Sequence, residues 1–305
     1  MRPEIEEAVR LIQRKDQQSL EDALALLQGT VYSFSMKVCG QREDAEDTMQ
    51  EVLVKSIPSL PKFDSPRALM VWLYRVAKSR CLMSRRKSKF APKETFSLER
   101  LMPDRKELQK LSRSRDGTPE TSILRRENAK RLRESVQKLP PEYRLILVLH
   151  DMEELSDADI AEITGLRLGT IRVRLHRARL FLRKELARLD RRRTDGRSAK
   201  ASAEMSVAAR PRRGRCKELF AQLSNYLDEE LDDSLCDELE KHLDGCEPCQ
   251  AFLSSLEKSI QLCRTAPNES PEPGMTARLR RQLMAEYQAV LSKMAARGAT
   301  DATPN

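Results

Sequence analysis

Aromatic residues and long apolar runs are both scarce in this chain of 305 residues. Only 4% of the residues are Phe, Trp or Tyr, and because strands favour aromatic and β-branched residues, this composition predicts an all-α fold. No apolar run approaches the roughly 18 residues of a membrane-spanning helix. The first residues, MRPEIEE, lack the apolar core of a secretory signal. We therefore expect a cytoplasmic protein with no membrane partner.

Catalytic motifs are missing as well. The chain has three histidines, and neither His150 nor His176 has a nucleophile motif nearby. No glycine-rich loop that could cradle a phosphate is present, and we find no internal repeat. The sequence therefore predicts a protein that is not an enzyme.

Charge is abundant but unevenly distributed. Charged residues make up 34% of the chain and give a net charge of +9. Residues 216–264 nevertheless hold 12 acids against 4 bases, so the rest of the chain is more basic than the average suggests. A basic body suits a polyanionic partner, whereas an acidic module suits a basic one or favours solubility.

Residues 155–186 have the pattern of two helices joined by a tight turn. Ser156 is a good N-cap for the first helix, and Gly165 stands where that helix should end. A second helix should open at Gly169, and its apolar positions are spaced four, three and four residues apart: Ile171, Leu175, Ala178 and Leu182.

The second of these helices is strongly basic. From residue 167 to residue 193 there are 11 Lys and Arg against two acids. A solvated helix face is the alternative, but such faces usually mix both signs. A helix-turn-helix with this charge is typical of proteins that read the DNA major groove.

The first part of the chain has its own helical patterns. Residues 41–56 place Ala45, Met49, Val52 and Leu53 on one apolar stripe. Residues 63–80 follow, and there we expect a buried helical face formed by Leu69, Trp72, Leu73 and Val76. A basic end with Arg85, Arg86 and Lys87 comes next.

These motifs resemble the sigma-70 family of transcription factors, in its short extracytoplasmic-function branch. DAEDTMQEV (residues 44–52) and WLYRVA (residues 72–77) are similar to region 2 of that family. LPPEYR (residues 139–144), ADIAEITGL and GTIRVRLHRAR are similar to region 4. The resemblance covers roughly the first 190 residues and implies a factor that directs RNA polymerase to promoters.

The resemblance to region 2 implies roles for single residues. The helix that begins near Asp44 would dock on the β′ clamp helices of core RNA polymerase. Phe63 would stand at the tip of a loop that cups a base flipped from the minus-ten element. Ser79 stands where many relatives have Asn. The expected polymerase contacts are Asp44, Asp47, Gln50, Glu51 and Val54, and the expected DNA contacts are Arg75, Lys78, Arg80, Arg85, Arg86 and Lys87.

The resemblance to region 4 implies recognition of the minus-thirty-five element and a contact with the β flap of the polymerase. Base edges are reached from the first turns of a recognition helix. Arg172, Arg174, His176 and Arg177 occupy these turns. Thr170 would bond a phosphate or cap the helix, and Val173 stands where relatives often have Ser or Thr.

Cysteines gather in the acidic C-terminal part. A disulfide framework is not expected for a cytoplasmic protein, although the chain has seven cysteines. His242, Cys246 and Cys249 have the H-x3-C-x2-C spacing of a tetrahedral zinc site. Cys216 is our choice of fourth ligand, and Cys236 is the competitor. The segments LSNYLDEEL and LEKHLDGCEPC resemble the zinc-binding anti-sigma domain, which clamps sigma factors.

The expected organisation is all-α, with two small helical domains joined by a flexible linker and followed by a small helical zinc domain. The predicted ranges are residues 1–90 (region 2), 91–121 (linker), 122–189 (region 4), 190–215 (basic linker), 216–264 (zinc domain) and 265–305 (Pro-rich segment and a last helix). The predicted function is that of a sigma factor whose zinc domain regulates it in cis, with zinc as cofactor and with core RNA polymerase and promoter DNA as partners. The alternatives are a DNA-binding regulator that acts without core polymerase, and a zinc domain that only adds stability or a binding surface.

Overall fold

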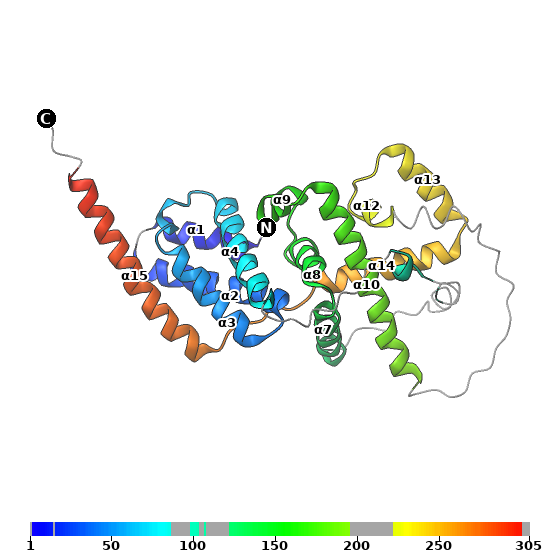
Figure 1. The fold of residues 1–305 in the computed structure, drawn as a ribbon, viewed down its shortest axis with the longest axis horizontal. Helices are drawn as coiled ribbons and strands as arrows, with labels where there is room; N and C mark the ends of the chain where they lie inside the picture. Colours follow the sequence, from blue (N-terminus) through cyan, green and yellow to red (C-terminus); the bar gives the residue numbers. More distant parts are fainter. Residues whose placement is uncertain are drawn as a thin grey trace. The chain divides into compact units, whose positions relative to one another are not determined.

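The computed structural model describes residues 2–14, 16–86, 98–103, 107, 122–195 and 222–300. Every regular element within these residues is helical, so the predicted all-α class is confirmed (Figure 1). The chain forms two compact units that are each discontinuous in sequence. Unit 1 consists of residues 1–91, 153–166 and 267–305, and unit 2 consists of residues 92–152 and 167–266.

Unit 1 is built around the long helix α2 (Gln17–Cys39). The Asp16 carboxylate caps this helix by accepting a 2.8 Å hydrogen bond from the Ser19 amide. Gly40 ends it in the left-handed conformation at φ 81°, which glycine adopts without the strain that a Cβ would bring. The helices packed against α2 are α1 (Pro3–Gln13), α3 (Arg42–Ser56), α4 (Pro66–Arg86) and α15 (Pro273–Thr300). The remaining two are η1 (Leu60–Lys62), which contacts α1, and α9 (Asp157–Thr164), which contacts α4.

The buried face of α4 differs in part from the expected one. Leu69 and Leu73 are fully buried as expected, but Trp72 and Val76 are only half-buried. The Trp72 ring lies beside the Phe63 ring, with 6.0 Å between their centroids. Met70, Tyr74, Ala77 and Cys81 complete the buried face instead.

A buried carboxylate lies inside unit 1. The Glu153 side chain is fully buried and accepts hydrogen bonds from Lys37 Nζ at 3.0 Å and from the Tyr74 hydroxyl at 2.7 Å. Arg2 also pairs with it. Burial, reinforced by the neighbouring Glu153 charge, raises the pKa of Tyr74. This cluster satisfies a charge that would otherwise be costly to bury.

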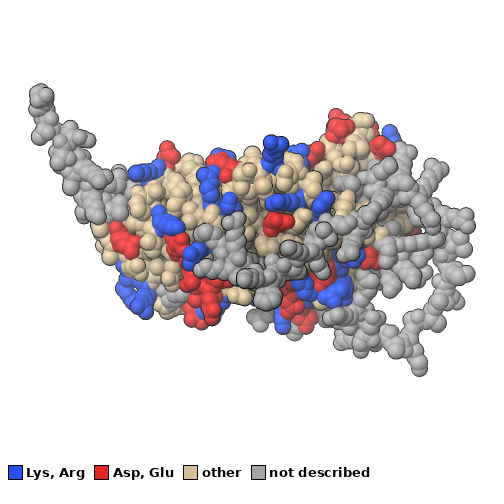
Figure 2. Space-filling model, viewed as in Figure 1, with Lys and Arg blue, Asp and Glu red and all other residues tan. Residues whose placement is uncertain are grey.

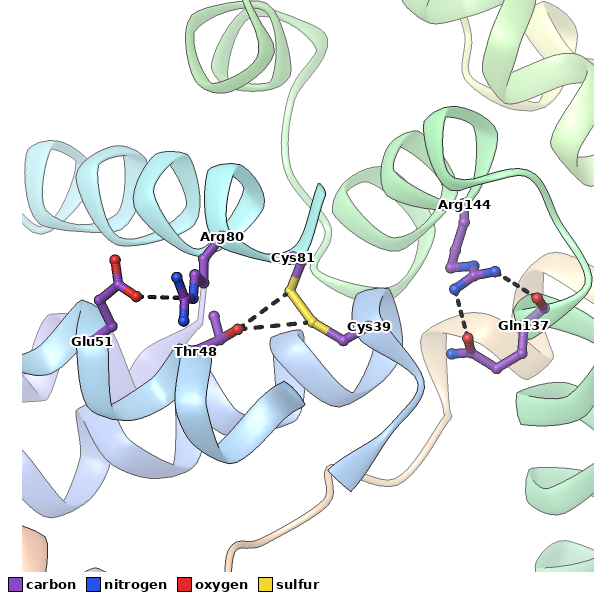
Figure 3. The surroundings of a disulfide bond; sticks show 7 residues. All are labelled: Cys39, Thr48, Glu51, Arg80, Cys81, Gln137 and Arg144. Carbon is purple, nitrogen blue, oxygen red and sulfur yellow. Dashed lines mark hydrogen bonds and ion pairs between the residues drawn. A yellow bond between two sulfur atoms is a disulfide. The ribbon is translucent and has the colours of Figure 1, made fainter. Parts of the chain in front are cut away.

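A disulfide joins Cys39 at the end of α2 to Cys81 on α4, with 5.4 Å between their Cα atoms (Figure 3). The Thr48 hydroxyl lies 3.9 Å from one sulfur and 3.8 Å from the other. Beside it, Arg80 and Glu51 form an ion pair at 2.9 Å. We expected no disulfide framework, and this single bond departs from that expectation, because residues 42 positions apart are brought together only by the packing of the helices.

Unit 2 combines the second half of the helix-turn-helix with the acidic C-terminal module. The longest helix is α10 (Leu168–Asp195). An apolar cluster contains Leu180 from this helix, Leu239 from α13, and Phe252 and Leu256 from α14. The helices of the unit are α5 (Leu98–Leu101), α7 (Ser122–Gln137), α8 (Pro141–Leu147), the π-helical segment η2 (Val148–Met152), α10, α12 (Leu223–Leu227), α13 (Asp233–Asp244) and α14 (Glu247–Arg264).

Candidate nucleic-acid, polymerase and zinc sites

The helix α3 presents the residues expected to bind polymerase. Its apolar stripe of Ala45, Met49, Val52 and Leu53 is fully buried, as predicted. Asp47 and Gln50 are exposed on the outer side, while Asp44, Glu51 and Val54 are half-buried. The arrangement leaves a polar surface at the middle of α3 that a partner could contact.

Glu51 is less free than Asp47. Its carboxylate pairs with Lys55 at 2.7 Å and with Arg80 on α4 at 2.9 Å. The hydrogen bond from Lys55, aided by the charge of Arg80, lowers the pKa of Glu51. A substitution at Glu51 would therefore disturb contacts of both α3 and α4, whereas a substitution at Asp47 would change only the exposed surface of α3.

The expected base-flipping loop lies between η1 and α4. Phe63 follows η1 directly and is half-buried against Trp72. Ser79 is exposed on α4, where its hydroxyl donates to the Arg75 carbonyl at 2.9 Å. The short Ser79 side chain is thus bonded to its own helix, whereas an Asn side chain at this position would extend its amide farther from α4.

The expected phosphate contacts on α4 already have protein partners. Arg75 donates to the Glu162 carbonyl at 2.8 Å, and Lys78 donates to the Ile163 carbonyl at 2.8 Å. Arg85 and Arg86 lie in the last turn of α4, but their side chains are outside the described structure, and Lys87 is outside the described residues altogether. Figure 2 shows basic and acidic side chains side by side on the face that it draws.

The first helix of the helix-turn-helix has the predicted ends. The Ser156 hydroxyl accepts from the Asp159 amide at 3.2 Å at the start of α9. Gly165 ends the helix at φ 74° in the left-handed conformation. Of the four residues that helical spacing places on its apolar stripe, Ile160 and Ile163 are buried, whereas Ala161 and Thr164 are half-buried.

The second helix, α10, begins one residue earlier than predicted, at Leu168. Its predicted apolar line of Ile171, Leu175, Ala178 and Leu182 is fully buried. Thr170, Arg174 and Arg177 are half-buried, and Val173 is 51% exposed. Side chains of the first turns thus remain open to a ligand on part of the helix surface.

A second line of side chains on α10 is covered, which the charge pattern of the sequence did not indicate. It consists of Arg172, His176, Arg179 and Arg183, a set that we name the basic stripe. These residues are spaced four, three and four positions apart and therefore share one side of the helix. We expected a solvated or DNA-facing surface here, but His176, Arg179 and Arg183 are buried.

The basic stripe begins with Arg172, which forms a two-pronged ion pair with Glu230. Two guanidinium nitrogens of Arg172 each lie 2.8 Å from a Glu230 oxygen. This geometry is that of a bidentate arginine–carboxylate pair, which is stronger than a single contact. Arg172 is thus held by an acid of the C-terminal module, not left open toward DNA.

His176 does not fit the expected role of a base reader in this structure. Only 7% of the residue is exposed. Burial, together with the nearby charges of Arg179 and Arg177, lowers the pKa of His176 to about 4. An imidazole that is buried and neutral at physiological pH cannot contact a base edge without a rearrangement.

Arg179 is the centre of a buried ion network. Its guanidinium donates to both Asp151 oxygens, at 2.9 and 2.6 Å, and to both Asp228 oxygens, at 2.7 and 2.8 Å. It also donates to the Ser224 hydroxyl at 2.8 Å. Burial alone would raise the pKa of Asp151, but the Arg179 charge outweighs this effect and holds that pKa at about 2. The network ties α10 to η2 and to α12.

Arg183, the last residue of the basic stripe, lies over an aromatic ring. Its guanidinium carbon lies 4.3 Å from the centre of the Phe252 ring on α14. A guanidinium above a ring face is attracted by the electrons of the ring, and burial strengthens the attraction. Leu180 and Phe181 pack into the same apolar cluster as Phe252, so α10 and the zinc module share one core.

The candidate metal site lies where α13 meets α14. His242 is in the last turn of α13, Cys246 caps α14, and Cys249 follows in the first turn of α14. Cys249 Sγ lies 3.2 Å from both His242 Nε2 and Cys246 Sγ. All three ligand atoms lie within 4.8 Å of one another. One imidazole and two thiolates are a donor set that suits zinc.

Two cysteines are candidates for the fourth ligand. Cys216, our first choice, lies outside the described residues. Cys236 is a free cysteine on α13, but it is not part of the group formed by His242, Cys246 and Cys249 among the described residues. Burial, and to a lesser extent the nearby acids, raises the pKa of Cys236, which favours its thiol form.

Comparison with known families gives three matches in the order that the motifs predict. Sigma-70 region 2 matches residues 24–90, and Sigma-70 region 4 matches residues 129–182. A zinc-finger family matches residues 216–250, the segment that holds the metal-ligand group.

Relatives among well-described proteins agree with these matches. The chain is 29% identical to the ECF RNA polymerase sigma factor SigW of Bacillus subtilis (strain 168) over 184 residues, which are 60% of this chain and 96% of SigW. It is 30% identical to the ECF RNA polymerase sigma factor SigM of Mycobacterium tuberculosis (strain H37Rv) over 148 residues, which are 48% of this chain and 67% of SigM.

The chain belongs to the ECF sigma factors. In this ECF sigma factor, the two segments that match sigma-70 regions both precede the segment that matches the zinc-finger family. Among the described helices, none is both long and apolar enough to cross a membrane.

Proposed function

We propose that this protein recruits core RNA polymerase to promoter DNA and that its C-terminal zinc module holds it inactive in cis. It acts in the cytoplasm and catalyses no reaction itself. The observation that carries the proposal is the basic stripe of α10, which lies on the helix matched by region 4 and is paired with the acidic module that follows. The proposed domains are those predicted from the sequence, residues 1–90, 122–189 and 216–264, with linkers between them.

Each sigma region has a proposed partner. In region 2, Asp44, Asp47, Gln50, Glu51 and Val54 bind the β′ clamp helices, while Phe63, Ser79 and the α4 cations Arg75, Lys78, Arg80, Arg85 and Arg86 bind the minus-ten strand. In region 4, which also contacts the β flap, Thr170, Arg172, Arg174 and Arg177 read the minus-thirty-five element. His176 would join them only after the stripe is uncovered.

Inhibition follows from the residues that the module engages. Arg172 cannot contact a base edge while Glu230 holds its guanidinium. Arg179 and Arg183 anchor the module through Asp228 and Phe252. The segment from residue 216 to residue 264 carries 12 acids and 4 bases, so its field complements the helix that it covers. These contacts favour an inhibitory sign over an activating one.

Zinc is proposed as the cofactor of this module. His242, Cys246 and Cys249 would hold it together with Cys216, or with Cys236 if the fourth ligand is supplied from α13. The bound ion would fix the turn between α13 and α14. Because thiolates must be deprotonated to bind metal, acid or oxidation of these cysteines would release the ion and loosen the module.

Reversal of one charge tests the polymerase contact. Asp47→Arg should abolish pull-down of core RNA polymerase by the full chain, because Asp47 is exposed on the outer side of α3. Asp22→Arg, an exposed charge reversal on α2, is the matched control and should leave pull-down intact. Undiminished pull-down by Asp47→Arg would favour a regulator that binds DNA without core polymerase.

A further inference from the structure

Helix α9 lies against the basic side of α4 within unit 1. Arg67 of α4 contacts two carboxylates of α9, Asp159 at 2.7 Å and Glu162 at 2.7 Å. Arg75 and Lys78 donate to backbone carbonyls in the last turn of α9, each at 2.8 Å, and Arg75 also lies 3.8 Å from a Glu162 carboxylate oxygen. Three cations of one helix thus meet the negative groups of another.

The groups that α9 offers resemble a phosphate backbone in their charge. The last carbonyls of a helix have no partner within the helix, and they carry the negative end of its dipole. In α9 the Glu162 and Ile163 carbonyls accept from Arg75 and Lys78. Carboxylate and carbonyl oxygens together therefore line up along α4 as acceptors for cationic side chains.

The spacing of the three cations suits an extended strand. Arg67 and Lys78 are separated by 11 positions, which corresponds to roughly 16 Å along a helix. Successive phosphates of one DNA strand advance by about 3.4 Å along a duplex and by more in an extended strand, so this length spans more than one phosphate. At 100° per residue, the three positions fall on one side of α4.

We propose that Arg67, Arg75 and Lys78 form one binding face for the phosphates of single-stranded DNA, and that α9 and the strand exclude each other on it. Arg67 is an added member of the DNA-binding set, which the sequence motifs did not indicate. The inference rests on the proposed function, because it assigns this face to the promoter strand. It makes α9 a resident competitor of DNA in the free protein.

The contacts between α9 and α4 are of a kind that a polyanion displaces. The side chains of Arg67, Arg75 and Glu162 are 52%, 49% and 45% exposed. Exposed ion pairs contribute little to stability because water screens them and side-chain ordering offsets the attraction. A DNA strand offers several phosphates at once and releases counterions when it binds. Burial, aided by the Arg75 charge, lowers the pKa of Lys78, so a phosphate stabilises its charged form better than a neutral carbonyl does.

The test measures the affinity of the full chain for a fluorescent oligothymidine strand, without core polymerase. The double variant Asp159→Asn, Glu162→Gln removes the competing carboxylates with little change of shape. We expect it to bind the strand several-fold more tightly, with a steeper dependence on salt concentration. The matched control is Glu142→Gln, Glu154→Gln, which removes two exposed charges elsewhere and should bind as the wild type does.

A second pair of substitutions decides whether α4 is responsible. Adding Arg75→Ala and Lys78→Ala to the double variant should remove the whole gain. A gain that survives these substitutions, or no gain at all, would overturn the proposal. In the wild-type chain, hydrogen exchange of the α9 amides should accelerate when oligothymidine is added, and unchanged exchange would also count against it.

This outcome is separate from that of the proposed function. Transcription by the chain with core polymerase tests the proposed function. Binding of oligothymidine by the chain alone tests whether α9 competes with the DNA strand for α4. Thermal melting of each variant confirms that it is folded before binding is compared.

Discussion

Two helices of this ECF sigma factor carry arginines that face carboxylates, yet the pairs differ sharply in exposure. On α4, the side chains of Arg67 and its partner Asp159 are 52% and 16% exposed. On α10, the side chains of Arg179 and its partner Asp228 in the acidic module are 1% and 10% exposed. The same chemical pair is therefore a surface contact in unit 1 and part of the interior in unit 2.

The difference separates an exchangeable contact from a structural one. A surface pair can be broken by water, salt or DNA at little cost. A buried pair cannot lose one member without leaving the other charged and desolvated, so its members stay together. We infer that α4 is masked reversibly, whereas the release of α10 requires the whole acidic module to detach.

Among the changes that test this difference, removal of zinc should have the largest effect on stability. Structural zinc sites contribute on the order of 10 kcal/mol to the folding of small domains. Chelation should therefore expose α12 to α14 and with them the Arg179 network, while the contacts between α9 and α4 persist. Hydrogen exchange before and after chelation measures both regions in one experiment. Protection of the residues around Phe252 that survives complete removal of zinc would contradict this account.

Truncation of the two arginines tests the contrast directly. Arg179→Ala should lower the free energy of unfolding of unit 2 by about 3–5 kcal/mol, because Asp151 and Asp228 lose their counter-charge. Arg67→Ala should lower that of unit 1 by less than about 1 kcal/mol.

Denaturant unfolding at neutral pH and saturating zinc gives both values. Equal losses in the two variants would show that burial does not distinguish the pairs. Because the pKa of Asp151 is held at about 2, its share of the stability should be present at neutral pH and be lost as the pH falls from about 4 toward 2.

Loss of the disulfide should destabilise unit 1 selectively. Reduction, or Cys81→Ser, should destabilise unit 1 by about 2–4 kcal/mol, because the bond between Cys39 and Cys81 restricts the unfolded chain. Unit 2 should be unaffected by the same substitution. Cys263→Ser, at a buried cysteine of unit 2, serves as the control for thiol chemistry elsewhere. A melting temperature of unit 1 that does not respond to reductant would refute this assignment.

Helical periodicity accounted for most of the fold. The apolar line from Ile171 to Leu182, the cap at Ser156 and the left-handed end at Gly165 all followed from local spacing and backbone preference. These features depend on residues close together in sequence. The same holds for the H-x3-C-x2-C group, whose ligands span a single turn between two helices.

The basic stripe could not be foreseen from charge alone. A line of arginines on a helix is normally solvated or bound to DNA, and only tertiary contacts decide otherwise. Arg179 meets Asp151 and Asp228, which are 28 and 49 positions away. The available signal was the four, three and four spacing of the basic residues together with the acidic run from Asp228 to Glu230. The pairing of Cys39 with Cys81 depends on tertiary packing in the same way.

Transcription from a pool of templates with randomised promoter segments tests the central claim most directly. Core RNA polymerase is combined with the wild-type chain, with Glu230→Arg, or with Glu229→Arg as an exposed neighbouring control. Glu230→Arg should repel Arg172 and raise transcript yield several-fold over the wild type, while Glu229→Arg should leave it unchanged. Equal or lower yield from Glu230→Arg would contradict inhibition by the zinc module.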